Sequence, residues 1–81
     1  LYFTVVAAQK GKDPEAQWWP VKKAASQAII DAGGTTTHHH GVGTDHRAFL
    51  PGEIGGPSMK LLHAIKDSVD PVGIMNPGKL V

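Results

Sequence analysis

Residues 13–34 read DPEAQWWPVKKAASQAIIDAGG and predict a long helix. Asp13 is a preferred N-cap, Pro14 suits the first helical position, and Glu15 places an acid in the first turn. The pair Gly33–Gly34 supplies the residue type that ends helices in a left-handed conformation. Between these ends an apolar stripe recurs at steps of three and four, through Trp18, Val21, Ala25, Ala28 and Ala32.

The segment before this helix, residues 1–8 (LYFTVVAA), is dense in β-branched and aromatic residues. This composition is typical of a strand, and alternation places Tyr2 and Thr4 on the face opposite Phe3. Because both faces are largely apolar, we expect the strand to be covered on both sides. Tyr2 and Thr4 are then the polar groups offered to whatever covers the second face.

The segments after the helix are harder to assign. Thr35–His38 is short and β-branched, which favours extended structure. Glycine, proline and polar residues then predict a loop over residues 41–56, apart from a turn near residues 48–50.

A second helix is expected to begin between Glu53 and Ser58. It should stop at Asp70, because the residue before a proline avoids the helical region. Residues 72–81 are expected to form an ordered, extended tail.

The expected fold class is α+β, with a strand, a long helix, a short extended segment carrying the histidines, a loop, a second helix and an extended tail. A sheet needs more strands than this chain supplies, so another segment or a second copy is expected to complete it. An unpaired edge of this kind favours a homo-oligomer. The chain also starts inside the apolar strand without an initiator Met, which indicates a piece of a longer protein.

Composition excludes several classes of protein. The 81 residues carry a formal net charge of +1, with no basic stripe that would indicate binding to nucleic acid. No apolar run approaches the length of a transmembrane span. Cysteine is absent, which excludes disulfides and thiolate metal ligands and favours a cytoplasmic location.

Three adjacent histidines, His38, His39 and His40, are followed by Gly41 and Gly43. In an extended chain the first and third point one way and the second the other, so one metal ion could take two of them but not three. No complete metal site is therefore predicted. Histidines also serve as hydrogen-bonded structural residues, but this glycine frame favours an acid–base site near neutral pH.

Two further features stay open on spacing alone. Arg47 can hold a phosphate or a carboxylate at two points, or it can form a salt bridge with Asp45 or Glu53. Residues 76–79, Asn-Pro-Gly-Lys, predict a turn.

Four pieces of the sequence, which together span essentially the whole chain, resemble a known family. They are LYFT at 1–4, GGT at 33–35 leading into HHHGVG at 38–43, DHR at 45–47, and AIK at 64–66 through DP at 70–71 to NPGK at 76–79. In this order they resemble the C-terminal end of FAD-linked oxidases of the vanillyl-alcohol-oxidase type. The likeness is greatest to the alkyldihydroxyacetonephosphate synthase (alkylglycerone-phosphate synthase) branch and its bacterial relatives.

The resemblance implies that residues 1–81 are the last part of a cap domain that covers a flavin. By position, Tyr2, His38, His39 and His40 belong to the catalytic site, with His40 the first candidate for acid–base work beside Tyr2. The implied reaction exchanges the acyl group of acyl-dihydroxyacetonephosphate for a fatty alcohol, in ether-lipid synthesis.

The implied cofactor is FAD, held mainly by an N-terminal domain that this chain lacks. Gly41, Gly43 and Asn76 are the residues of this chain expected beside the cofactor. Arg47 is a weaker candidate for binding substrate, since the phosphate-binding arginines of the family lie upstream. The isolated chain is expected to be inactive.

Two alternatives stand beside this interpretation. FAD-linked oxidoreductases of 2-hydroxy acids, such as glycolate or D-lactate, carry Gly-Glu-His-Gly-Ile-Gly at the corresponding place, where His39 replaces the glutamate. A small histidine-rich module that binds metal is the third hypothesis. The expected partner is a small-molecule lipid or hydroxy acid, and a lipid substrate would allow peripheral contact with a membrane from the cytoplasm.

Overall fold

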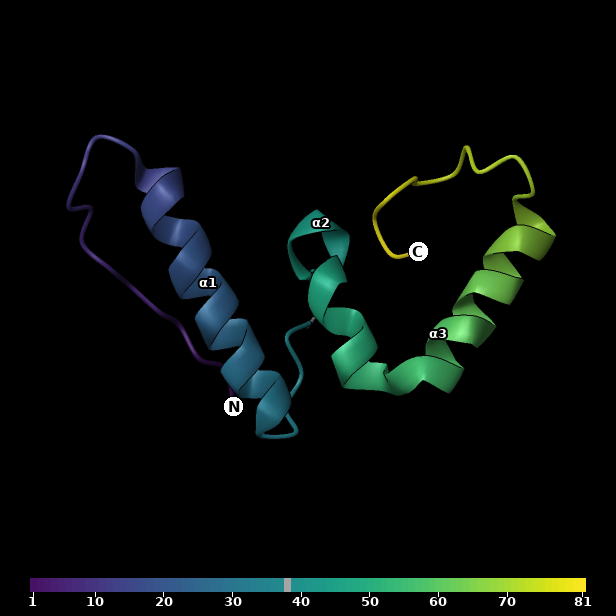
Figure 1. Cartoon of the computed structure of the whole chain (residues 1–81), viewed down its shortest axis with the longest axis horizontal. Coiled ribbons are helices and arrows are strands. Elements are labelled where there is room, and N and C mark those ends of the chain that lie inside the picture. The colour runs from purple at the N-terminus through teal and green to yellow at the C-terminus, as the bar shows by residue number, and fades with distance from the viewer. Residues whose placement is uncertain (38) are drawn as a thin grey trace.

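The computed structural model describes residues 1–37 and 39–81. In chain order the helices are α1 (Pro14–Asp31), α2 (Gly43–His46), the 3₁₀ helix η1 (Arg47–Phe49) and α3 (Leu50–Val69). Figure 1 shows α1 and α3 on either side of the short helices, with the C-terminal tail curling back from the far end of α3.

Local capping signals define α1 as the sequence predicts. The side chain of Asp13 accepts hydrogen bonds from the N–H groups of Glu15 and Ala16, at 3.1 and 3.0 Å. At the other end Gly33 has φ +76°, and the N–H of Gly34 donates to the carbonyl of Ile29 at 2.8 Å. A residue with a Cβ would be strained at that φ, so the glycine ends the helix.

The predicted loop over residues 41–56 is wrong in its central part, where α2, η1 and the first turn of α3 form. Phe49 and Leu50 are the buried apolar residues of the described chain, at 9% and 5% exposure. Their burial next to α1, which η1 contacts, stabilises turns that glycine and proline would otherwise disfavour. The fit is close: a Cβ on Gly52 would lie 3.1 Å from Cγ2 of Ile30.

Helix α3 is broken at Gly55, whose φ of 81° and ψ of 163° lie in a region that is essentially reserved for glycine. Pro57 follows within the same helix. The part after the break begins where the sequence predicts the second helix to start. Its end is also confirmed, since the helix stops at Val69 and Asp70 is its C-cap.

The predicted strand is not confirmed, and neither is the α+β class. Residues 1–8 have no strand assignment, nor do Thr35–Thr37, and the chain over residues 1–37 and 39–81 is helical with irregular connections. A strand exists only when its N–H and C=O groups pair with those of a neighbouring strand, and no strand is assigned within residues 1–37 and 39–81.

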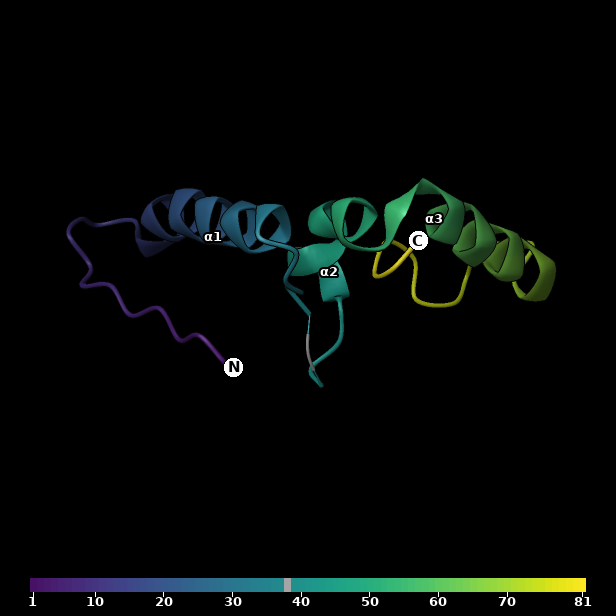
Figure 2. The same ribbon diagram turned by 90° about the horizontal axis from the view of Figure 1, so that it is seen from below.

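The N-terminal segment is instead tied to α1 by one side chain. Gln17 donates from Nε2 to the carbonyl of Ala8 at 2.8 Å and accepts from the N–H of Lys10 at 2.9 Å. In Figure 2 this segment and the loop at residues 39–42 project from the same side of the row of helices.

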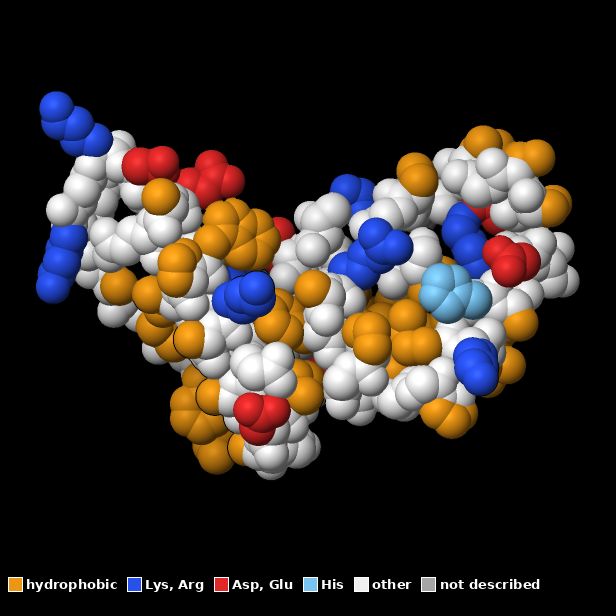
Figure 3. Space-filling view, in the orientation of Figure 1, with side chains coloured by type: hydrophobic (Ala, Val, Ile, Leu, Met, Phe, Trp, Pro, Cys, Tyr) orange, Lys and Arg blue, Asp and Glu red, His pale blue; other side chains and the backbone are white. Residues whose placement is uncertain are grey.

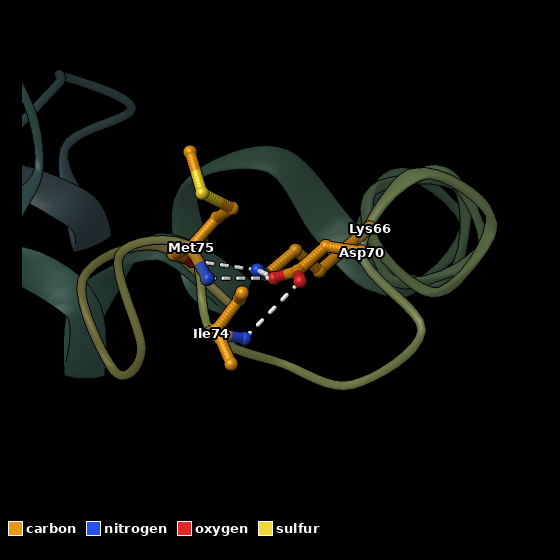
Figure 4. A network of polar contacts seen from close by, with 4 residues as sticks. All are labelled: Lys66, Asp70, Ile74 and Met75. Carbon is orange, nitrogen blue, oxygen red and sulfur yellow. Dashed lines mark hydrogen bonds and ion pairs between the residues drawn. The ribbon is translucent and has the colours of Figure 1, made fainter.

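The tail is folded back by a network around Asp70, so it is not the extended arm that the sequence predicts (Figure 4). The carboxylate of Asp70 accepts from the N–H groups of Ile74 and Met75, at 3.1 and 2.9 Å. It also accepts from the ammonium of Lys66, which donates to the carbonyl of Met75 at 2.6 Å. The predicted Asn-Pro-Gly-Lys turn then forms, with Lys79 N–H donating to the carbonyl of Asn76 at 3.3 Å.

Little apolar surface is buried. The radius of gyration is 15.1 Å, against about 12 Å for a compact domain of this length. Figure 3 shows apolar side chains on the surface over both ends of the molecule. Large apolar side chains that are more than half exposed include Leu1, Phe3, Val6, Leu61, Ile65, Val69, Val72, Ile74 and Met75. Within the described ranges, residues 1–37 and 39–81, no helix is both long and apolar enough to cross a bilayer.

Replacing Asp13 with Ala should destabilise α1 by about 1 kcal/mol, because two N–H groups lose their acceptor. Hydrogen–deuterium exchange of the first-turn amides should rise correspondingly. Asp13→Asn keeps a capping oxygen and serves as the control, so equal exchange in the two variants would contradict the assignment.

Replacing Asp70 with Ala should release the tail. The hydrogen bond from Lys66 is the main cause that lowers the pKa of Asp70, together with the N–H groups of Met75 and Ile74. The stabilisation is therefore complete above the ordinary carboxyl pKa and is lost as the pH falls through the lowered value. Limited proteolysis at neutral pH should cut residues 72–76 of Asp70→Ala faster than those of Asp67→Ala, and equal rates would contradict this role.

Candidate functional site

An open groove of about 1230 Å³ lies between the N-terminal segment and α1. Its walls are mainly apolar side chains of both segments, including Phe3, Val5, Trp18, Val21 and Ile29. The polar residues that border it include Tyr2, Thr35–Thr37, Lys22 and His46. The groove thus joins an apolar wall to the residues that precede the histidine run.

Tyr2 meets the histidine loop directly. Its hydroxyl oxygen is 3.1 Å from Nδ1 of His39, although the two residues are 37 positions apart. The ring of His40 lies edge-on against that of His39, with centroids 4.2 Å apart and an angle of 67° between the planes. A phenol and an imidazole at hydrogen-bond distance can pass a proton between them, which is the basic requirement for acid–base chemistry.

The structure therefore brings together three of the residues expected in the catalytic site, Tyr2, His39 and His40. The hydrogen bond described for Tyr2 is to His39, whereas the resemblance placed His40 first. His38, also expected in the site, lies outside the described residues. Within the described ranges no three His, Asp or Glu side chains form a group suited to a metal ion.

The backbone of the two glycines after the histidine run, Gly41 and Gly43, is not covered by other atoms of the described chain. Gly41 and Gly43 have φ values of +81° and +59°, and a Cβ on either would meet nothing within 4 Å. Such glycines allow a flat ligand to approach the backbone closely.

The side chain of Arg47 lies near the turn of the tail that contains Asn76. One guanidinium nitrogen of Arg47 lies 3.7 Å from the place a Cβ on Gly78 would occupy, within the turn that Asn76 opens. Asn76 itself has φ +46°, a left-handed conformation that asparagine tolerates better than most residues. Among the described residues Arg47 forms no salt bridge with Asp45 or Glu53, the alternative that spacing alone left open.

His46 links the loop to α1, a role that sequence reasoning missed. Its Nδ1 is 3.0 Å from the carbonyl of Val42, and its Nε2 is 2.8 Å from the ammonium of Lys22. Because the carbonyl can only accept and the ammonium can only donate, these contacts select the tautomer with the proton on Nδ1. No motif or spacing in the sequence indicates that Lys22 and His46 form a pair.

Glu53 was also missed. Its carboxylate accepts from the hydroxyl of Thr35, from the N–H of Thr36 at 3.1 Å and from the hydroxyl of Thr36 at 3.3 Å. Burial raises the pKa of Glu53, but hydrogen bonds from Thr35, Thr36 and Thr37 outweigh it and hold the pKa below its ordinary value. The available signal was the run of three threonines before the histidines, which offers several donors at once.

The profile of the family described as "FAD linked oxidases, C-terminal domain" matches residues 1–80. The chain belongs to this family. The resemblance deduced from the motifs is thereby confirmed.

Among curated proteins, alkyldihydroxyacetonephosphate synthase of Trypanosoma brucei brucei is 33% identical over all 81 residues, which cover 13% of that protein. The mitochondrial cytochrome-type D-lactate dehydrogenase of Arabidopsis thaliana is 46% identical over 42 residues, 52% of this chain and 7% of that protein. No solved structure matches the chain. The chain thus spans only a small part of the relatives it matches.

An FAD-linked family raises the question of whether the residues present fit a flavin. The open backbone at Gly41 and Gly43, directly after the His39–His40 pair, offers a surface without side chains against which a planar ring can lie. These residues could cover one face of the ring. Nothing in the described chain lies within 4 Å of a Cβ placed on Gly41 or Gly43, so no other described residue is positioned there to cover the opposite face.

The lowered pKa of Glu53 gives a pH dependence of stability. Hydrogen bonds to the ionised carboxylate stabilise the fold fully above the ordinary pKa of 4.5, and this contribution is lost as the pH falls through the lowered value. Glu53→Gln should destabilise the protein by roughly 1 kcal/mol near neutral pH. Denaturation midpoints of the variant and the wild type should converge in acid, and a constant difference at all pH values would contradict the assignment.

Proposed function

We propose that this chain is the C-terminal part of the cap domain of an FAD-dependent enzyme of the alkyldihydroxyacetonephosphate synthase type. The observation that carries the proposal is the contact between Tyr2 and His39, which joins the N-terminal segment to the histidine loop. Similarity to the trypanosomal synthase along the whole chain supports the same assignment. The reaction replaces the acyl group of acyl-dihydroxyacetonephosphate with a fatty alcohol.

In this proposal Tyr2 and His39 move the proton that the reaction removes from a carbon of the substrate. Nδ1 of His39 takes the phenolic proton across 3.1 Å, which leaves the Tyr2 oxygen able to accept a proton from the substrate and later to return it. His40 packs against the ring of His39 and holds its plane.

The glycine backbone after the histidines would face the cofactor. Gly41 and Gly43 would let the FAD ring approach without a side chain between them. FAD, when bound, supplies the electron-accepting ring that the chain itself does not contain. The apolar wall of the groove, which includes Phe3 and Trp18, suits the hydrocarbon part of a lipid substrate.

A second candidate is an FAD-linked oxidoreductase of a 2-hydroxy acid. The observation that favours it is the 46% identity to a D-lactate dehydrogenase over half of the chain. In such a reaction the same Tyr2–His39 pair would accept the proton of the substrate hydroxyl. The presence of His39, where that group of enzymes carries a glutamate, favours the synthase type.

The test uses the full-length, FAD-loaded protein. The enzyme should exchange the acyl group of acyl-dihydroxyacetonephosphate for a long-chain fatty alcohol without net reduction of the flavin. D-lactate should not reduce the flavin, which is measured as loss (bleaching) of its visible absorbance. Bleaching by D-lactate without exchange would support the second candidate, and neither activity would exclude both.

Within the active protein, Tyr2→Phe should lower kcat by about 10²–10⁴-fold, because the phenolic proton carrier is lost while the ring remains. His39→Gln should act in the same direction. His63→Gln, which alters an exposed histidine of α3, is the matched control and should leave kcat unchanged. A Tyr2→Phe enzyme with wild-type kcat would remove Tyr2 from the mechanism.

A further inference from the structure

The carboxylate of Glu53 holds the segment that leads into the histidine run. Its three donors come from Thr35 and Thr36, which precede it by 18 and 17 residues. Thr36 is 8% exposed, so two of these bonds form largely out of bulk water. Hydrogen bonds to an ionised acceptor are about twice as strong as neutral ones, and three of them give this contact a defined geometry.

The threonines are also bonded to one another. The N–H of Thr37 donates to the hydroxyl oxygen of Thr35 at 3.2 Å, while the single proton of that hydroxyl is donated to Glu53. His39 follows Thr37 by two residues, so its Cα can lie no further than about 7 Å from that of Thr37. A fixed turn at Thr35–Thr37 therefore restricts where the imidazole of His39 can go.

Glu53 is itself well anchored. It lies in the first turn of α3, immediately after the buried Phe49 and Leu50 and beside Gly52, which packs against Ile30. This is the best packed part of the described chain, and the break at Gly55 separates it from the rest of α3. The carboxylate thus projects from the turn that directly follows these buried residues.

We propose that Glu53 is a positioning residue for the Tyr2–His39 pair. It fixes Thr35–Thr37 against the buried base of α3 and thereby sets the distance at which His39 meets Tyr2. The inference rests on the proposed function, in which that pair moves the proton. Glu53 acts through the threonines and does not touch the reacting atoms.

The first experiment measures kcat and KM of Glu53→Gln in the full-length enzyme, with activity expressed per bound flavin. Displacement of His39 should lower kcat about 10- to 100-fold while KM changes less than threefold. A purely structural role would reduce the amount of loaded enzyme and leave kcat per flavin unchanged. Glu15→Gln, an exposed acid in the first turn of α1, is the matched control.

A second set of variants reaches the same contact from the threonine side. Thr35→Val removes the hydroxyl and should reproduce the loss of kcat, whereas Thr35→Ser keeps it and should restore near wild-type kcat. Because the two side chains act through one contact, Thr35→Val with Glu53→Gln should be little worse than either alone. Additive losses, or equal kcat for the Val and Ser variants, would overturn the proposal, and this pair decides if Glu53→Gln fails to fold.

Hydrogen–deuterium exchange separates this proposal from the proposed function. Amides of Thr36 and residues 39–41 should exchange faster in Glu53→Gln than in Glu15→Gln, whatever the enzyme catalyses. If exchange is faster in Glu53→Gln but the protein has neither synthase nor dehydrogenase activity, Glu53 positions the loop and the proposed function is wrong. Unchanged exchange, or wild-type kcat per flavin in an active protein, would overturn the role of Glu53.

Discussion

Three donors from Thr35 and Thr36 converge on the carboxylate of Glu53, and this contact joins parts of the chain that share little else. Apolar burial in the described chain is concentrated at Phe49 and Leu50, so packing alone fixes few distances. Before the histidine run, hydrogen bonds to the ionised carboxylate of Glu53 hold the chain where apolar packing is sparse. The contact between Tyr2 and His39 depends on this arrangement, because the loop begins where the threonines end.

Elements with local causes could be predicted from sequence. Asp13 and Gly33 set the two ends of α1, because a cap and a left-handed glycine each act within a few residues. Asp70 before a proline set the end of α3 for the same reason. The family could also be predicted, because its short motifs are recognised by their residues and their order along the chain, without knowledge of the fold.

Features that depend on distant partners could not be predicted in the same way. Residues 1–8 have the composition of a strand, but a strand also needs a neighbour, and the described chain supplies none. The turns around Phe49 arise from burial next to α1, which glycine and proline content conceals. For the site, motif likeness predicted Tyr2 and the histidines, whereas the contact of Tyr2 with His39 and the hydrogen bonds between Glu53 and the threonines required coordinates.

The break at Gly55 divides α3 into two parts with different neighbours. The turn before it carries Glu53, whereas the longer part after it carries Lys66 and Asp70, which fold the tail. Since only glycine adopts that backbone conformation readily, the joint is confined to one position. A change of backbone angle at Gly55 would therefore re-aim the second part and its tail without moving the turn that carries Glu53.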